Sequence, residues 1–225
     1  MELIPTVELL ERQLNDVEQR YAPSELWVRG DVSLLAPSCV RVSLVGSRKA
    51  SQEGLRRCRK LSRLLVDEGV VVVSGLAQGI DTAAHRAAIE SGGRTVAVVG
   101  TGIDRVYPTA NRRLQEEIAT DHLLVSQFPP GAPPNKRHFP QRNRTMALVS
   151  DATVIIEAGE TSGSLHQGWE ALRLARPLFV LRSVLASDLG WPDKMLGYGA
   201  RVLDDVGELL DWVPTPVPPP AALAI

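Results

Sequence analysis

Three short segments rich in glycine and small hydroxyl residues each follow an apolar run and precede an amphipathic one. Glycine lets the main chain approach a ligand closely, and the unpaired N–H groups at the start of a helix attract anions. In a parallel sheet the loops that follow the strands emerge at one edge, so distant segments meet there. We therefore predict a phosphate-binding site built from Gly46, Ser47, Arg48 and Lys49, from Ser74, Gly75 and Gly79, and from Gly100, Thr101 and Gly102.

The second candidate element is the basic segment NKRHFPQRNR, residues 135–144. Guanidinium groups bind phosphates in a bidentate manner, and an aromatic ring such as Phe139 offers a face on which an unpaired base can stack. This combination favours single strands over duplexes. The alternative is that Phe139 and Pro140 only fix a loop to the core. The candidate phosphate ligands of this segment are Lys136, Arg137, Arg142, Asn143 and Arg144.

The elements that must position these residues alternate between strand and helix. Continuous apolar runs indicate strands that are buried on both faces, as in a parallel sheet covered by helices. The pattern predicts an α/β fold with a Rossmann-like, doubly wound and mostly parallel sheet. The predicted strands are 41–47, 69–75, 94–100, 122–128, 152–158, 177–183 and 200–204, and the clearest helices are 52–68, 80–91, 109–120 and 164–175.

The 225 residues are enough for one substantial domain with short extensions. We place a Rossmann-like domain at 41–212, a helical extension at 1–40 and a proline-rich disordered tail at 213–225. In the extension an apolar stripe at helical spacing predicts a helix that docks on its own domain, with a homodimer contact as the alternative. The stripe consists of Leu3, Val7, Leu10, Leu14 and Val17.

The net charge of −1 conceals a separation of sign along the chain. Residues 1–40 carry 3 Lys and Arg against 7 Asp and Glu, residues 41–147 carry 17 against 9, and residues 148–225 carry 5 against 10. A basic middle between acidic ends suits a polyanion site, although solvated helix faces would give the same count.

The composition also bears on location and cofactors. The acidic N-terminus lacks the features of a secretory signal, and no apolar run is long enough for a membrane span, so we expect a cytoplasmic protein without a membrane partner. Cys39 and Cys58 lack CxxC spacing and are expected to be free thiols. No ligand spacing predicts a metal site, and we predict no cofactor.

The sequence favours a binding protein over an enzyme. It contains no GxxxxGK[ST] phosphate loop, and GTGIDR after the third predicted strand lacks the final glycine of GxGxxG. The four histidines are scattered without a neighbouring nucleophile, so we expect structural roles for them and no catalytic residue.

Several of these segments, in this order, resemble the DprA/Smf family of DNA-processing proteins. The resemblance is carried by VSLVGSRKAS, by SGLAQGIDTAAH with GTGIDRVYP, by FPQRNR and by ETSGSLHQG, over about residues 42–166. It implies a Rossmann-like domain that binds single-stranded DNA, forms a homodimer and delivers the strand to a RecA-type recombinase during natural transformation or recombination.

The resemblance also implies the residues of the site. The GSR segment at 46–48, the SGxAxGID loop at 74–81 and the RNR at 142–144 match the family, with Arg48, Lys136, Arg142 and Arg144 as the expected phosphate ligands. Asp81 is expected to orient its loop, since its charge would repel an anion. The family's SGS turn corresponds to Ser162, Gly163 and Ser164.

The sequence departs from the family after Ser164, so the edge of the pocket is expected to differ there. Many members also carry an N-terminal helical domain and a C-terminal winged helix, and we expect neither in these 225 residues.

Two other functions remain alternatives. One is a nucleoside-monophosphate phosphoribohydrolase, which uses a GGxGTxxE motif; here Gln167 stands where the catalytic carboxylate would fall, with Glu170 one turn further on. The other is a sensor that binds a small nucleotide-derived ligand and signals to a partner protein.

Overall fold

The computed structural model describes residues 1–186 and 188–214 of the chain. Its centre is a nine-stranded sheet in the order β1-β2-β6-β5-β4-β3-β7-β8-β9. All neighbours from β6 to β9 pair in parallel, whereas β1 and β2 pair antiparallel at one edge. The strands are β1 Glu2–Pro5, β2 Glu25–Gly30, β3 Arg41–Gly46, β4 Val71–Ser74, β5 Thr95–Val99, β6 Leu123–Ser126, β7 Ala152–Glu157, β8 Leu178–Leu181 and β9 Arg201–Leu203.

The seven predicted strands are confirmed as β3 to β9. In β4, β5 and β6 every residue is buried, because helices cover both faces of the sheet. Such strands gain stability from apolar side chains at every position, which gives the continuous Val, Ile and Leu runs of the sequence. The predicted Rossmann-like α/β fold is thus present.

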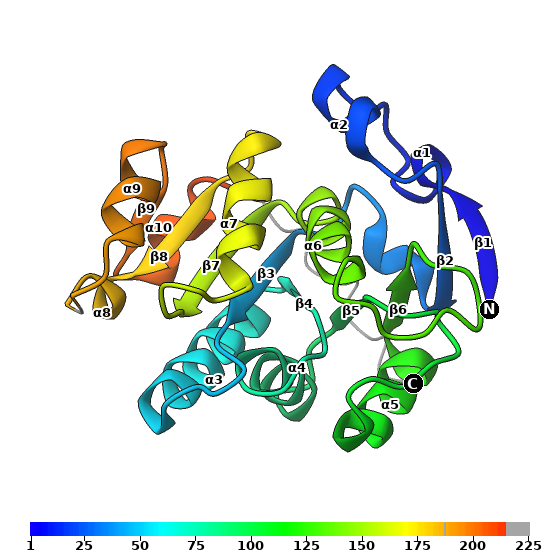
Figure 1. Cartoon of the computed structure of the whole chain (residues 1–225), viewed down its shortest axis with the longest axis horizontal. Helices are drawn as coiled ribbons and strands as arrows, with labels where there is room; N and C mark the ends of the chain where they lie inside the picture. Colours follow the sequence, from blue (N-terminus) through cyan, green and yellow to red (C-terminus); the bar gives the residue numbers. More distant parts are fainter. Residues whose placement is uncertain (187, 215–225) are drawn as a thin grey trace, which may run out of the picture.

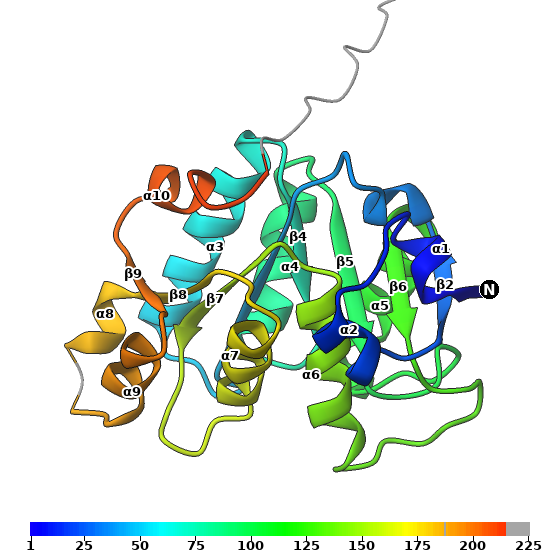
Figure 2. The same cartoon turned by 90° about the horizontal axis from the view of Figure 1, so that it is seen from above.

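Helices lie in two layers on the faces of the sheet. Figure 1 shows α3, α4 and α5 on one face and α6 and α7 on the other. Figure 2 shows the sheet crossing the molecule between these layers, with β9 at one end and β2 at the other. The longer helices are α3 Gln52–Asp67, α4 Ile80–Glu90, α5 Arg112–Asp121, α6 His138–Leu148 and α7 Ser164–Arg173; the shorter ones are α1 Thr6–Leu9, α2 Asp16–Tyr21, α8 Arg182–Leu185, α9 Trp191–Gly197 and α10 Val206–Leu210, with 3₁₀ turns at Val32–Leu35 and Thr109–Asn111.

The chain changes direction across the sheet between β3 and β7. From β3 it adds β4, β5 and β6 to one side, and it then returns to place β7, β8 and β9 on the other side of β3. The loops that leave β3 and β7 therefore run to opposite sides, which opens a crevice at the carboxyl ends of these two strands. The functional cavity lies at this switch point.

The predicted helix through residues 3–17 is wrong. The segment forms β1, the single turn α1 and the separate helix α2, and β2 follows within the same extension. Leu10 and Leu14 are buried, but Leu3, Val7 and Val17 are each more than 40% exposed. β1 pairs with β2, which in turn pairs with β6, and this pairing across the sheet overrode the local heptad spacing.

Two further expectations concern the termini and the cysteines. Of the predicted disordered tail, residues 215–225 lie outside the described residues. Cys39 and Cys58 are free thiols, as predicted, and burial raises the pKa of Cys58 to about 12. Within residues 1–186 and 188–214, no helix combines the length and apolarity needed to cross a bilayer.

Candidate functional site

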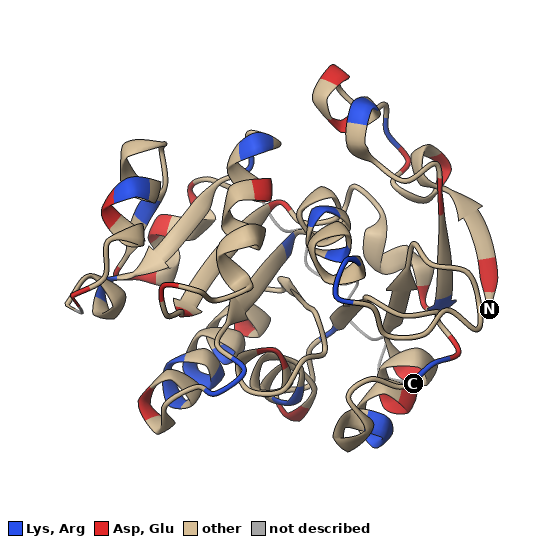
Figure 3. Cartoon of the chain, in the orientation of Figure 1, with Lys and Arg blue, Asp and Glu red and all other residues tan. Residues whose placement is uncertain are grey.

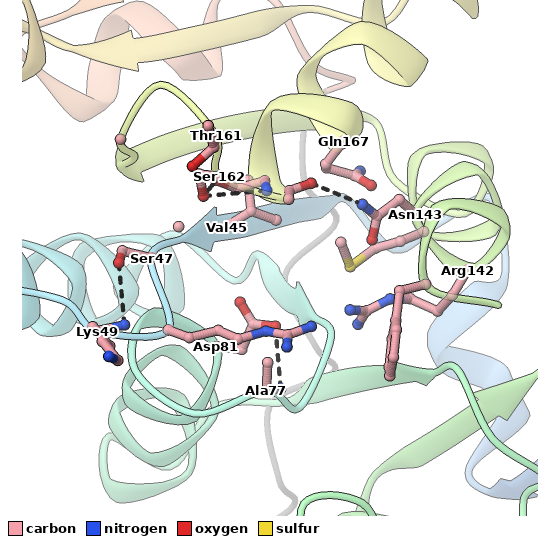
Figure 4. Close-up of a pocket in the computed structure, with 17 residues that line it drawn as sticks. Val45, Ser47, Lys49, Ala77, Asp81, Arg142, Asn143, Thr161, Ser162 and Gln167 are labelled. Atoms are coloured by element: carbon pink, nitrogen blue, oxygen red, sulfur yellow. Dashed lines mark hydrogen bonds between the residues drawn. The ribbon is translucent and has the colours of Figure 1, made fainter. Parts of the chain in front are cut away.

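A cavity of about 590 Å³ lies at the carboxyl ends of β3 and β7. Its walls come from four separate segments: the loop after β3, the loop before α4, the first two turns of α6 and the loop between β7 and α7 (Figure 4). The predicted site residues that line it are Gly46, Ser47, Arg48, Lys49, Arg142, Asn143, Ser162, Gly163 and Ser164.

The loop after β3 places two cations at the mouth of this cavity. The Ser47 amide donates to the Glu157 carbonyl (2.7 Å), and the Lys49 amide donates to the Ser47 hydroxyl (3.1 Å). Because both amides already donate hydrogen bonds within the chain, a ligand would contact mainly the side chains of this loop. Neither Arg48 nor Lys49 forms an ion pair with a carboxylate of the described residues. An anionic ligand could therefore pair with these two cations.

The loop between β4 and α4 supports the wall from below. Gly79 has φ +79°, and a Cβ there would overlap the carbonyl of Ser47, so only glycine fits the close approach of the two loops. A Cβ at Gly75 would overlap the guanidinium of Arg142. The Ser74 hydroxyl donates to the Leu44 carbonyl (2.7 Å) and is buried. Ser74, Gly75 and Gly79 therefore hold the cavity in shape and are not among its lining residues.

Asp81 and Arg142 form a buried pair of opposite charges at the floor of the cavity. Both are at most 6% exposed, and the Arg142 guanidinium donates to the Val98 carbonyl (2.9 Å). Burial raises the pKa of Asp81 and lowers that of Arg142, while the attraction between the two acts against both changes. The Asp81 carboxylate also accepts from the Ala77 amide (3.2 Å), which confirms the expectation that it orients this loop.

The loop after β5 is mostly separate from the main cavity. Gly100 and Thr101 line a smaller side cavity of about 60 Å³, together with Tyr107 and Phe139. Gly102 lines neither: its amide donates to the Ala132 carbonyl (2.9 Å), and a Cβ there would press on the main chain of residues 129–132. The structure thus assigns Gly102 to loop packing.

Phe139 separates the two cavities and lines both. Its ring packs against Gly100, where a Cβ would lie 2.9 Å from the ring, and it lies 5.7 Å from the Tyr107 ring between centroids. The Arg48 guanidinium sits 5.3 Å from its centroid. Phe139 therefore both fixes the start of α6 and presents part of its ring to the cavity.

The segment at 135–144 is largely helical, which the sequence analysis did not predict. Helix α6 begins at His138, and Pro140 lies in its first turn, where a missing N–H is tolerated. Helical geometry then directs Arg142 and Asn143 to the cavity and Arg144 away from it, toward Glu170 (3.2 Å) and the Tyr21 ring. Lys136 and Arg137 precede the helix and do not line the cavity.

The loop between β7 and α7 closes the cavity with hydroxyl groups. The hydroxyls of Ser162 and Ser164 lie 2.7 Å apart, and the Asn143 amide donates to the Gly163 carbonyl (3.2 Å), as Figure 4 shows. Thr161 and Gln167 also line the cavity, although the sequence analysis did not list them among the site residues. Spacing could have identified Gln167, because it lies three residues after Ser164 and hence on the same face of α7.

His85 follows the second glycine-rich loop and is part of the core. His85 is completely buried, with its Nδ1 2.7 Å from the Thr95 hydroxyl. Burial lowers its pKa to about 3, so the ring is neutral at physiological pH. It lies behind the sheet edge and does not line the cavity.

The fold and the cavity define a class of protein: a Rossmann-like α/β domain that presents cations and hydroxyl groups at its switch point. A family model described as DNA recombination-mediator protein A matches residues 9–213. The chain belongs to this family, as its resemblance to the DprA/Smf proteins predicted.

Individual proteins of the family are also similar to the chain. It is 44% identical over 167 residues to DNA processing protein DprA of Streptococcus pneumoniae. The matched residues make up 74% of this chain and 58% of that relative. The chain therefore corresponds to little more than half of the relative's length.

Two solved structures share the whole described fold. An X-ray structure of DprA from Streptococcus pneumoniae superposes with a TM-score of 0.83 at 35% identity, over 95% of this chain and 74% of that one. DNA processing protein A of Helicobacter pylori, described by its single-stranded DNA binding mode, superposes with a TM-score of 0.77 at 28% identity, over 94% and 93% of the two chains.

Proposed function

We propose that the chain binds single-stranded DNA, without strong sequence preference, in the cavity between β3 and β7. The observation that carries the proposal is the pair of unpaired cations, Arg48 and Lys49, facing a wall of hydroxyl groups across the carboxyl edge of the sheet. Cations and hydroxyls bind phosphate oxygens, which are the same in every nucleotide. Similarity to the Helicobacter pylori protein, whose single-stranded DNA binding is described, supports the assignment.

The shape of the cavity favours an unpaired strand. Phe139 lies at its wall beside Arg48, and a base can stack on an aromatic ring only when it has left the stack of a duplex. A phosphate beside Arg48 would bring the attached base within reach of this ring. In the proposal, Arg142 at the floor adds a positive charge to the cavity from a fixed position.

We also infer from family membership that the chain acts in the cytoplasm as a homodimer and delivers the bound strand to a RecA-type recombinase. The description of the family as recombination mediators supports the second partner. Sedimentation of the chain alone and with RecA would test both associations, and a monomer that does not sediment with RecA would contradict them.

A small nucleotide is a second candidate ligand. The cavity volume of about 590 Å³ falls in the range of ordinary small-molecule sites, roughly 300–1,000 Å³. A sensor of this kind would saturate with one nucleotide, whereas a strand-binding protein needs several.

Hydrolysis by the phosphoribohydrolase mechanism has less support. Gln167 is the group that reaches the cavity at the position of the catalytic carboxylate, and an amide cannot act as a base. Glu170 does not line the cavity; its carboxylate is held by Arg144 (3.2 Å) and Arg173 (3.7 Å).

The test is a fluorescence-anisotropy titration with a labelled dT oligomer at two salt concentrations, with duplex DNA and mononucleotides as competitors. Wild-type protein should bind tightly, resist both competitors and lose affinity with salt. Arg48→Ala should bind all sequences more weakly and reduce the salt-dependence slope by about 0.7, the value for one lost phosphate contact. Efficient competition by a mononucleotide would favour the sensor, and an unchanged slope would remove Arg48 from the site.

A further inference from the structure

The cavity does not end at the loop after β3. A second hollow of about 430 Å³ shares Ser47, Lys49 and Gly159 with it, and a third of about 260 Å³ shares Arg57 and Ser183 with the second. The second is lined by the end of β7 and the third by the ends of β8 and β9, and α3 contributes to both. Together the two hollows form a groove that continues from the cavity along the carboxyl edge of the sheet, and we name it the α3 groove.

Cations follow this groove in order. Lys49 stands at its junction with the cavity, Arg57 lines both hollows, and Lys60 lines the outer one. Arg57 and Lys60 are three residues apart in α3 and so share one face of the helix. Figure 3 shows the concentration of blue on α3, and Figure 4 places Lys49 on the side of the cavity opposite Arg142.

The carboxylates of the groove are already engaged. Glu157 accepts from the Ser51 amide (2.8 Å) and hydroxyl, Asp204 pairs with Arg182, and Asp205 caps α10 through the Gly207 amide (2.8 Å). Arg182 therefore compensates the charge of Asp204, whereas Glu157 and Asp205 keep their charge but direct their oxygens to donors of the chain itself.

The cations, by contrast, can accept a new partner. Lys49 and Lys60 have no ion pair within residues 1–186 and 188–214. Arg57 contacts Glu53 (3.1 Å), but both side chains are more than 40% exposed, and such a pair contributes about 1 kcal/mol at most. Ser183 also lines both hollows, although its hydroxyl is buried.

We propose that a DNA strand held in the cavity continues along the α3 groove, with its phosphates bound by Lys49, Arg57 and Lys60. This inference rests on the proposed function of the cavity. Neither hollow is lined by an aromatic side chain, so the groove binds the backbone and leaves the bases unstacked. The contribution of the groove therefore depends on strand length and not on sequence.

The same helix offers a matched control. Arg59 and Arg63 are exposed, as Lys60 is, but they line neither hollow. Two double variants remove equal charge from α3. Arg57→Gln/Lys60→Gln, the groove variant, removes it from the groove, and Arg59→Gln/Arg63→Gln, the control variant, removes it from outside the groove. Thermal melts of both would verify that the fold is intact.

The experiment measures the affinity of wild type and both double variants for dT oligomers of increasing length at several salt concentrations. Loss of two phosphate contacts should reduce the salt-dependence slope by about 1.4 for long oligomers and weaken binding about tenfold at physiological salt. The groove variant should show this loss only above the length that fills the cavity, and the control variant should match wild type.

Four outcomes would overturn the inference. Equal losses in both variants would indicate a general effect of charge, and a loss at every length would place Arg57 and Lys60 at the cavity itself. A wild type that binds longer oligomers no better than the shortest bound one would exclude the groove while leaving the proposed function intact. A wild type that binds no oligomer would instead overturn the proposed function and this inference together.

Discussion

Arg142 and Arg144 lie two residues apart on α6, yet they belong to two different regions of the molecule. Arg142 is buried at the floor of the cavity beside Asp81, with a fixed hydrogen bond to the Val98 carbonyl. Arg144 lies on the other side of the helix, between Glu170 and the ring of Tyr21 in the N-terminal extension. One side of α6 forms the site, and the other side fixes the extension to the domain.

Arg12 of the extension is neutralised by a buried carboxylate, and the cations at the mouth of the cavity are not. Glu18 is 1% exposed and accepts from Arg12 (2.7 Å) and Arg176 (2.9 Å). Burial alone would raise its pKa, but these two cations and the Asn15 amide lower it below its ordinary value. Arg48 and Lys49 form no ion pair with a carboxylate in residues 1–186 and 188–214. Charge pairing, and not the number of arginines, therefore distinguishes a site for anions from a structural cluster.

Arg142→Ala should have the largest effect on stability of the variants considered. The variant removes the cation that faces the buried Asp81 and the donor to the Val98 carbonyl, so we expect a loss of about 3 kcal/mol in the free energy of unfolding together with weak DNA binding. Urea denaturation and anisotropy would measure the two effects. An unchanged unfolding midpoint would show that Arg142 is a surface ligand and not part of the core.

Gly79→Ala sharpens the contrast between the packed and open loops of the cavity. Positive φ and overlap with the Ser47 carbonyl should destabilise the protein by about 2 kcal/mol. Gly163→Ala is the matched control, because a Cβ there meets no atom within 4 Å, and its unfolding midpoint should stay within about 0.5 kcal/mol of wild type. Equal losses in both variants would contradict the close approach of the loops after β3 and β4.

His85 is a buried base, and no carboxylate is among the groups that shift its pKa in the described part of the chain. Its pKa is about 3 in the folded protein and near 6.5 in the unfolded chain, so only the unfolded chain gains the proton as pH falls. The contribution of His85 to the free energy of unfolding is fully present above pH 6.5. Between pH 7 and 5 this free energy should fall by roughly 2 kcal/mol in the wild type, because the unfolded chain binds the proton. His85→Gln should show a flatter fall of the melting temperature over this range. A slope equal to that of wild type would mean that His85 keeps an ordinary pKa.

Arg144→Ala should have the smallest effect on stability. It should lower stability without changing DNA binding, whereas Arg48→Ala should weaken DNA binding. The loss of the contacts to Glu170 and Tyr21 should cost about 1 kcal/mol of stability, because Arg173 still faces both groups. Binding of the dT oligomer should not change. A reduced salt slope in the titration would return Arg144 to the phosphate site.

Much of the fold was predictable because its signals are local. The strands β3 to β9 carry apolar side chains on both faces, and this requirement is visible in short runs such as 71–73 and 95–99. The extension was mispredicted because its strands are short and partly exposed, so the pairing of β1 with β2 and of β2 with β6 leaves little trace in the apolar pattern. Helix α6 was missed because Pro140 suggests a loop unless it is placed in the first turn.

The site was predicted in part. The alternation of strand and helix predicted that residues 46–49, 74–79 and 100–102 meet at one sheet edge, and of these only 46–49 and Ala77 line the main cavity; residues 162–164, which also line it, came from the family resemblance. The sequence did not reveal that the amides of Ser47 and Lys49 already donate to a backbone and a side-chain oxygen. Hydrogen-bond partners of this kind come from distant segments, which local spacing does not reveal.

The sequence by itself determined the strand and helix alternation, the edge at which the glycine-rich loops meet, and the family that their motifs match. Tertiary structure decided which cations form ion pairs: Arg142 faces the buried Asp81 and Arg144 pairs with Glu170, whereas Arg48 and Lys49 form no ion pair with a carboxylate of the described residues. Backbone patterns are set by neighbours in the chain and are therefore visible in the sequence. The pairing of long charged side chains depends on segments brought together only by folding.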